Sequence, residues 1–266
     1  MISNFVTSSP RSELRAASPA RLSLGRVGDG MPTAEVLRFG WAHATTRDAI
    51  HAALDVASLN GSLHQQGWET EHVRSRASDR AEYLRRPDLG RQLDGDDAAR
   101  LLTGAARSGE KVACDICFIV ADGLSCLAVQ RHAVPLLTAL RPLVPFDTTF
   151  SPVVIATQAR VAIGDEIGEA LGARLSIVLI GERPGLSSPD SLGIYLTYAP
   201  RKGRNDAQRN CISNVRPEGL AYEFASFKLA WLIRESQHRE MSGVDLKEES
   251  HLDVLEAGAS ALVVGR

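Results

Sequence analysis

Four short apolar runs in the middle of the chain are typical of buried β-strands. Between the first three runs, in residues 125–140 and 161–173, the apolar positions recur with the period of an α-helix. Strands that alternate with helices predict an α/β fold with a mostly parallel sheet flanked by helices. The four runs are residues 112–121 (VACDICFIVA), 151–159 (SPVVIATQA), 174–182 (RLSIVLIGE) and 191–200 (SLGIYLTYAP).

Helices are also expected on both sides of this central region. The apolar residues between positions 32 and 54 suit two short amphipathic helices, of which Thr46 and Asp48 could start the second. Residues 221–238 have the pattern of a closing helix. The stretch 25–86 is too small for a core of its own, so we expect it to pack on something else.

Pro87 marks the expected end of that stretch, because a residue before proline disfavours the helical conformation. The N-terminal residues lack the basic-then-apolar order of a signal peptide, so we expect a disordered tail there. The chain is therefore divided into a disordered tail (1–24), a helical partner-contacting arm (25–86), an α/β domain (87–243) and a C-terminal tail of unknown role (244–266).

The charge balance argues against nucleic acid or an anionic membrane as the main partner. Thirty basic and 32 acidic residues leave a net charge of only −2. No stretch approaches the roughly 20 apolar residues that span a bilayer. The four cysteines lie in apolar or mixed segments rather than in a loop-rich framework, which favours a reducing, cytoplasmic location.

Two loops follow predicted strands, where open parallel sheets bind ligands. In ADGLS, Asp122 and Ser125 form either a structural turn that caps the next helix, which we favour, or part of a site. In IGERPG, Glu182 and Arg183 form either a solvated pair on a surface turn or a ligand contact, and the two interpretations are balanced. Neither loop has a glycine-rich phosphate-binding motif, so a dinucleotide site is a weak hypothesis.

Other candidate chemistry is sparse. Cys114 and Cys117 have metal-ligand spacing, but they lie within one strand with no second pair nearby, so we expect buried structural thiols on opposite faces. No histidine stands in a catalytic or metal-binding motif, so we assign neither a catalytic residue nor a metal ligand. The polar segment 201–217 is either a solvated loop or, slightly favoured, a loop that faces a ligand.

Five segments together resemble the small (light) chain of ethanolamine ammonia-lyase, and the resemblance covers about residues 25–243. It implies a Rossmann-like fold and an adenosylcobalamin-dependent lyase that converts ethanolamine to acetaldehyde and ammonia by a radical route. In that family a large TIM-barrel chain holds the substrate, and the cofactor lies between the two chains. The segments are RPDLGRQL, VADGLSCLAV, ARVAIGDEIGEALGA, IVLIGERPGLSSPDSLGIYLTYAPR and NCISNVRPEGL.

The resemblance assigns cofactor contacts to Val161, Glu182 and Cys211. A corrin carries amides whose N–H groups need acceptors, and a carboxylate acceptor is worth about 1.5–3 kcal/mol. The sequence contains no D-x-H-x-x-G loop, which fits base-on cobalamin binding. Gly30 stands near the place of a second arginine expected after GRxG. The sequence does not decide whether the complex is packaged in a bacterial microcompartment.

Two alternatives come from other functional classes. One is a free-standing Rossmann-like protein that binds a nucleotide, although the glycine-rich fingerprint is missing. The other is a scaffold subunit with a vestigial pocket. Substitution of Glu182 separates the scaffold from a cofactor-binding chain, because only the latter would lose cobalamin affinity.

Overall fold

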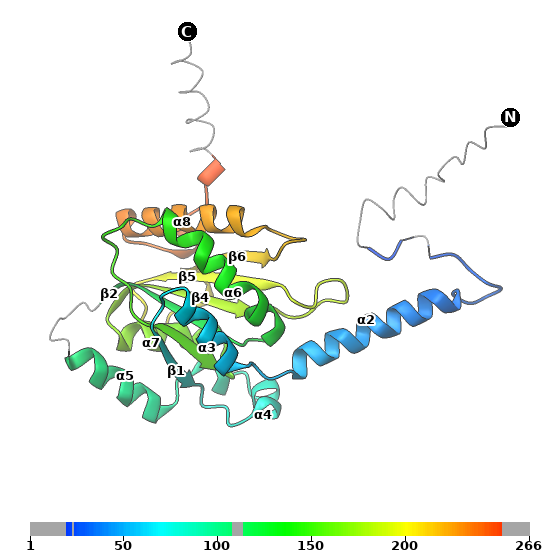
Figure 1. The fold of residues 1–266 in the computed structure, drawn as a ribbon, viewed down its shortest axis with the longest axis horizontal. Coiled ribbons are helices and arrows are strands. Elements are labelled where there is room, and N and C mark those ends of the chain that lie inside the picture. Colours follow the sequence, from blue (N-terminus) through cyan, green and yellow to red (C-terminus); the bar gives the residue numbers. More distant parts are fainter. Residues whose placement is uncertain (1–19, 23, 108–113, 252–266) are drawn as a thin grey trace, which may run out of the picture.

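The computed structural model describes residues 20–22, 24–107 and 114–251, so the predicted tails lie mostly outside the described residues. Its centre is a six-stranded mixed sheet with helices on both faces (Figure 1). The strands lie in the order β1-β3-β2-β4-β5-β6. Their bounds are Thr70–Arg74 (β1), Cys114–Ala121 (β2), Val153–Thr157 (β3), Ala173–Gly181 (β4), Leu192–Tyr198 (β5) and Arg209–Val215 (β6).

The prediction of a mostly parallel sheet is wrong for one side of the sheet. Strands β1, β3, β2 and β4 run parallel, whereas β5 and β6 run antiparallel to their neighbours. The segment 182–191 joins β4 to β5 without a helix. A parallel return needs a crossover of about a dozen residues or more, so the chain reverses direction here. The α/β class is confirmed, with a mixed sheet.

The two edge strands were not predicted, because their hydrophobic pattern is weak. In β1 only Val73 is fully buried, and in β6 the buried Ile212 and Val215 are separated by exposed polar residues. An edge strand at the rim of a sheet buries only part of its side chains. The segment 25–86 therefore contains a sheet strand besides its helices, and β6 occupies part of the polar segment 201–217.

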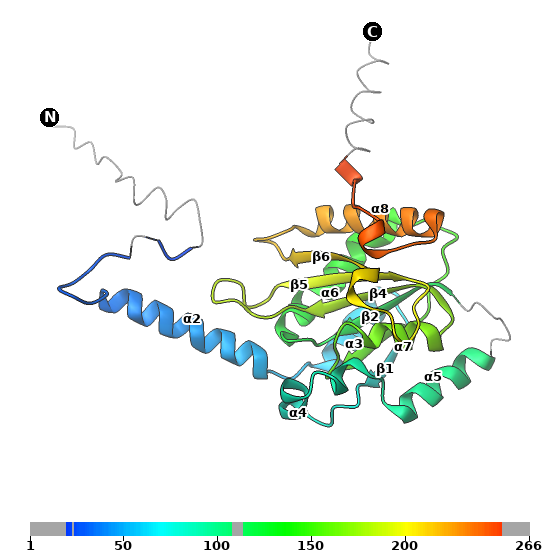
Figure 2. The same cartoon turned by 180° about the vertical axis from the view of Figure 1, so that it is seen from behind.

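Helices cover both faces of the sheet and explain the unbroken apolar runs of β2 and β4 (Figures 1 and 2). The predicted helices at 125–140, 161–173 and 221–238 are confirmed. One face packs against α3 (Val56–Gln65), α6 (Cys126–Leu140) and α8 (Tyr222–Arg239), and the other against α5 (Gly95–Arg107) and α7 (Ile163–Ala170). Short 3-10 turns are η1 (Leu89–Arg91), η2 (Arg141–Leu143), η3 (Asp206–Gln208) and η4 (Gly243–Asp245).

A single helix, α2 (Thr33–His51), replaces the two short helices predicted near the N-terminus. Thr46 and Asp48 lie inside it rather than at a start, because no proline interrupts this alanine-containing stretch. The helix projects from the body of the molecule (Figure 1), and Ala49 is its only buried residue. It connects through α3 and β1 to the short helix α4 (Arg80–Arg85).

Candidate functional site

An open cavity of about 420 Å³ lies at the carboxyl ends of three parallel strands. Gly123 follows β2, Arg160 and Val161 follow β3, and Glu182 and Arg183 follow β4 in its wall. Helices α6 and α7 leave β2 and β3 toward opposite faces of the sheet. Such a divergence opens a crevice at the strand ends, where α/β proteins bind ligands.

The loop after β2 is primarily structural. Asp122 is buried, and its carboxylate accepts hydrogen bonds from the backbone N–H groups of Gln158 (2.8 Å) and Ala159 (2.9 Å). Burial raises the pKa of Asp122, and these donors together with Arg80, whose Nη1 lies 3.8 Å from Oδ2, oppose the rise. Ser125 caps α6 by accepting from the N–H of Ala128, so the structural interpretation of ADGLS is confirmed.

The same contacts bear on nucleotide binding. In a phosphate-binding loop, backbone N–H groups after a strand point toward the ligand. Here the donors of Gln158 and Ala159, after β3, are already used by Asp122. The turn before α7 therefore has fewer free backbone N–H groups with which to hold a nucleotide phosphate.

Two glycines bring the loops after β2 and β4 into direct contact. Gly123 has a φ of +57°, and a Cβ at this position would lie 2.2 Å from the carbonyl oxygen of Gly181. A Cβ on Gly181 would in turn lie 2.0 Å from the carbonyl oxygen of Ser125. No side chain fits at either position, so both glycines are needed for the close contact between the two loops.

Glu182 is held in place by Ser191, which precedes β5, and by Asn214 of β6. Its carboxylate accepts from the Ser191 hydroxyl and, at 3.3 Å, from the backbone N–H of Asn214. A Cβ on Gly193 would lie 2.9 Å from Glu182 Oε1, so the glycine makes room for the carboxylate. Among the described residues Glu182 forms no ion pair with Arg183, and the interpretation as a solvated Glu-Arg pair is wrong.

A partly buried ionic cluster anchors the segment that carries Ser191. The neighbouring Asp190 accepts from Arg131 Nη1 at 2.8 Å, and His132 Nε2 lies 3.5 Å from the same oxygen. Burial alone would raise the pKa of Asp190, but Arg131 and His132 hold it below its ordinary value. Burial lowers the pKa of His132, whose Nδ1 lies 2.7 Å from the hydroxyl of Tyr222.

Two of the three predicted cofactor contacts lie in one cavity, and the third lies beside it. Val161 and Glu182 both line the cavity. Cys211 is exposed on β6 and pairs across the strands with Tyr195, which does line the cavity. Burial, followed by Cys211 and Glu182, raises the pKa of Tyr195, so its phenol stays protonated. Sequence patterns missed Arg160 and Tyr195, because nothing in one chain marks a strand or turn residue as facing a cavity.

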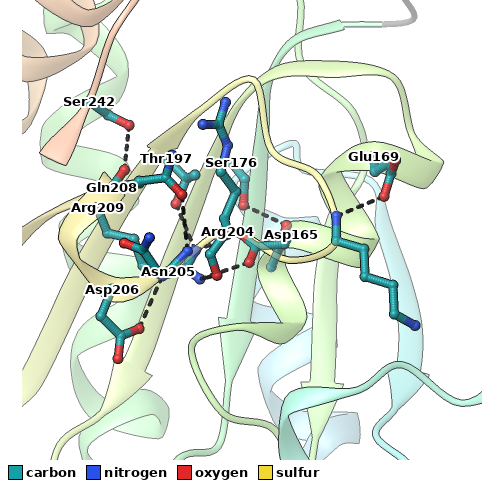
Figure 3. Close-up of polar contacts among 12 residues, drawn as sticks. Asp165, Glu169, Ser176, Thr197, Arg204, Asn205, Asp206, Gln208, Arg209 and Ser242 are labelled. Atoms are coloured by element: carbon teal, nitrogen blue, oxygen red, sulfur yellow. Dashed lines mark hydrogen bonds and ion pairs between the residues drawn. The ribbon is translucent and has the colours of Figure 1, made fainter.

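The polar segment 201–217 divides into a tethered loop and strand β6. Figure 3 shows Arg209 at the start of β6 directed at Asp165 of α7, with Nη1–Oδ1 and Nη2–Oδ2 distances of 2.5 and 2.7 Å. Both side chains are only 3% exposed. Burial would lower the pKa of Arg209, but Asp165 raises it above its ordinary value. Residues 201–208 are therefore anchored to α7 through Arg209. It is strand β6 that brings Cys211 next to the cavity.

The cysteines of β2 are buried structural thiols, as predicted. Cys114 and Cys117 are both free and buried, and burial raises the pKa of Cys117 to about 12. The expectation that they face opposite sides is wrong, because both pack into the cluster beneath α5 and α7.

The fold and the cavity define an α/β protein with an open cavity at the carboxyl edge of its sheet. Within the described ranges, no helix is long and apolar enough to cross a membrane. Residues 8–247 match the family model of the ethanolamine ammonia-lyase light chain.

Individual proteins similar to this chain are named ethanolamine ammonia-lyase small subunits. An ethanolamine ammonia-lyase small subunit from Pseudomonas syringae pv. tomato is 52% identical, over 97% of this chain and 90% of that protein. Small subunits from Ralstonia nicotianae (53%; 95% and 93%) and Azotobacter vinelandii (51%; 96% and 94%) are equally similar. The chain belongs to the ethanolamine ammonia-lyase light-chain family, whose members are subunits of a lyase.

Proposed function

We propose that this chain binds one flank of adenosylcobalamin in an ethanolamine ammonia-lyase that converts ethanolamine to acetaldehyde and ammonia. A large chain with a TIM-barrel fold would bind the opposite flank and hold the substrate. Family membership supports the reaction. The observation that carries the cofactor role is the convergence of Val161 and Glu182 on one cavity, with Cys211 beside it.

The residues present fit part of such a cofactor. A cavity of about 420 Å³ suits a drug-sized ligand, so it would take only one edge of a corrin. Its wall offers a carboxylate acceptor from Glu182, a phenol from Tyr195 and apolar surface from Val161 and Ile180. An edge that carries amides and alkyl groups needs this combination of partners.

The residues of this chain would orient the cofactor rather than react. When bound, adenosylcobalamin supplies the organic radical chemistry. Glu182, fixed by Ser191 and Asn214, retains acceptor capacity for an amide N–H at the edge of the ring. Val161 and Cys211 would contact the ring through apolar or backbone atoms. We assign no acid, base or nucleophile to this chain, and we expect it to be inactive alone.

We further propose that the N-terminal arm contacts the large chain through α2. Three of the exposed apolar residues of α2 line one surface patch, in which Trp41 is 77% exposed. The C-terminal end of α2 is tied to the cavity, because Arg80 donates to the carbonyl oxygens of Ile50 and Gly123, both at 2.7 Å. A partner that extends from this patch to the C-terminal end of α2 would therefore also lie close to the cofactor site. The patch contains Val36, Leu37 and Trp41, and the exposed Phe39 lies outside it.

The complex would be located in the cytoplasm, since all four cysteines are free thiols. Base-on binding remains our proposal, supported by the absence of a D-x-H-x-x-G loop from the sequence. Packaging in a bacterial microcompartment is a further prediction, which imaging of the native host would test.

The decisive test is Glu182→Ala in the assembled two-chain complex. Loss of a charge-assisted acceptor should weaken hydroxocobalamin binding by about 1.5–3 kcal/mol, and deamination should fall at limiting cofactor. The matched control is Glu223→Ala, since Glu223 is exposed in the first turn of α8. Unchanged cobalamin affinity in Glu182→Ala would favour a scaffold with a vestigial pocket and reject the proposal.

A further inference from the structure

Arg160 presents a positive charge to the cavity without an acidic partner. It is half-buried and lines the same cavity as Glu182, on the loop between β3 and α7. Its Nη2 donates to the carbonyl oxygen of Tyr83 at 3.3 Å, and its Nε is buried with no hydrogen-bond partner. Within the described residues it forms no ion pair, whereas the neighbouring Arg80 lies 3.8 Å from Asp122. A half-buried charge without a counter-charge is costly unless a ligand supplies one.

The guanidinium of Arg160 is also held in a fixed position. It stacks on the ring of Tyr83 with its Cζ 4.3 Å from the ring centroid. The backbone N–H of Arg160 donates to Gly90 at 2.7 Å, and a Cβ on Gly90 would lie 2.9 Å from Arg160 Cγ. A planar guanidinium positioned in advance loses little entropy when it binds an oxyanion.

The surroundings of Arg160 favour an anion. Helix α7 begins three residues later at Ile163, and its N-cap residue, Ala162, makes no side-chain capping bond. The first turn of α7 carries Asp165 and Glu166, but these carboxylates already pair with Arg209 and Lys202 and leave the charge of Arg160 uncompensated. Arg183 also lines the cavity next to Glu182, so the lining carries two guanidinium groups and one carboxylate.

We propose that Arg160 binds the phosphate of the cofactor's nucleotide tail, an inference that rests on the proposed function. The peripheral amides of a cobalamin are neutral, and its phosphodiester is the anionic group able to compensate an unpaired guanidinium. Glu182 and Arg160 then divide the recognition: the carboxylate accepts from an amide of the ring, and the guanidinium donates to the phosphate.

The experiment compares three corrinoids in the two-chain complex by absorbance titration. Hydroxocobalamin and cobinamide phosphate carry the phosphate, and cobinamide lacks it. Arg160→Met should weaken binding of the first two by about 10- to 100-fold, which is the loss of one charge-assisted hydrogen bond. Cobinamide affinity should change by less than about threefold. Arg174→Met, at the other end of β4, is the control for loss of an arginine.

Arg160→Lys keeps the charge but not the planar fork, so an intermediate loss for the two phosphate-bearing ligands is expected. If the two-chain complex does not assemble with Arg160→Met, Arg160→Lys is used in its place. Equal weakening of all three corrinoids, or none, would overturn the inference. The inference would also be overturned if inorganic phosphate competed in an Arg160-dependent way while the order of affinities for the three corrinoids did not depend on Arg160. A wild-type complex that binds no corrinoid would instead reject the proposed function.

Discussion

The loops after β2 and β4 occupy equivalent places in the fold, and each begins with an acidic residue, yet the two carboxylates have different roles. Asp122 is buried, and two backbone donors and Arg80 satisfy it. Glu182 is only partly buried, receives bonds from Ser191 and Asn214, and lines a cavity. A carboxylate satisfied by its own chain stabilises the fold, and one that retains acceptor capacity at a cavity is available to a ligand.

The largest expected effect is on stability, in Asp122→Ala. The substitution leaves the N–H groups of Gln158 and Ala159 without their acceptor and removes the counter-charge of Arg80. We expect the free energy of unfolding to fall by about 3–5 kcal/mol, measured by urea denaturation. Glu182→Ala should cost less than about 1 kcal/mol in the same assay. A similar loss in both variants would show that the two loops do not differ in role.

A pair of glycines gives a matched comparison of the same loops. Gly123→Ala forces a side chain into a positive-φ position 2.2 Å from the Gly181 oxygen, so we expect a loss of about 1–3 kcal/mol or more. Gly185→Ala meets no atom closer than 3.9 Å and should change stability by less than about 0.5 kcal/mol. Thermal unfolding of both variants checks the difference, and a tolerated Gly123→Ala would contradict the close contact between the loops.

A smaller effect is expected on ligand affinity, in Ser191→Ala. Loss of the hydroxyl that donates to Glu182 should weaken hydroxocobalamin binding by about 0.5–1.5 kcal/mol, because the carboxylate is less firmly positioned. Ser187→Ala is the control, since Ser187 is exposed in the same segment between β4 and β5. Ser191→Thr should restore affinity if the hydroxyl, rather than packing, is responsible. Equal affinity in all three variants would argue that Glu182 needs no such support.

The smallest expected effect is a pH dependence specific to the β4–β5 loop. His132 faces Asp190, Arg131 and Tyr222, and its pKa is lowered below the ordinary 6.5, chiefly by burial. The unfolded chain therefore binds this proton more readily, so stability should fall as the pH drops below about 6.5. The slope for one proton cannot exceed about 1.4 kcal/mol per pH unit. His132→Gln should flatten the curve in this range, and an unchanged slope would assign it to another group.

The pKa of Asp190 is also lowered, so its contribution is lost as well when the pH falls. That loss occurs nearer the ordinary carboxyl value of 3.8, which separates it from the loss caused by His132. Unfolding of the His132→Gln variant, measured from about pH 2 to about 7, should therefore retain the loss below pH 3.8 and lack the loss near 6.5.

The central strands could be predicted because both faces of β2, β3 and β4 are buried, which leaves unbroken apolar runs in the sequence. Edge strands β1 and β6 could not, because each buries only alternate or isolated positions. The direction of β5 was also missed, although the short helix-free segment before it carried the signal.

The candidate site divides along the same line. The sequence by itself determined that acidic residues would follow strands at the sheet edge, because strand ends and turn residues have local signatures. Only the tertiary structure decided that the acceptors of Asp122 are used by the β3–α7 turn, whereas Glu182 shares a cavity with Val161 and Arg160. These relations join residues that are distant along the chain. Local pattern carries no information on them, because they depend on strand order and on which face each helix covers.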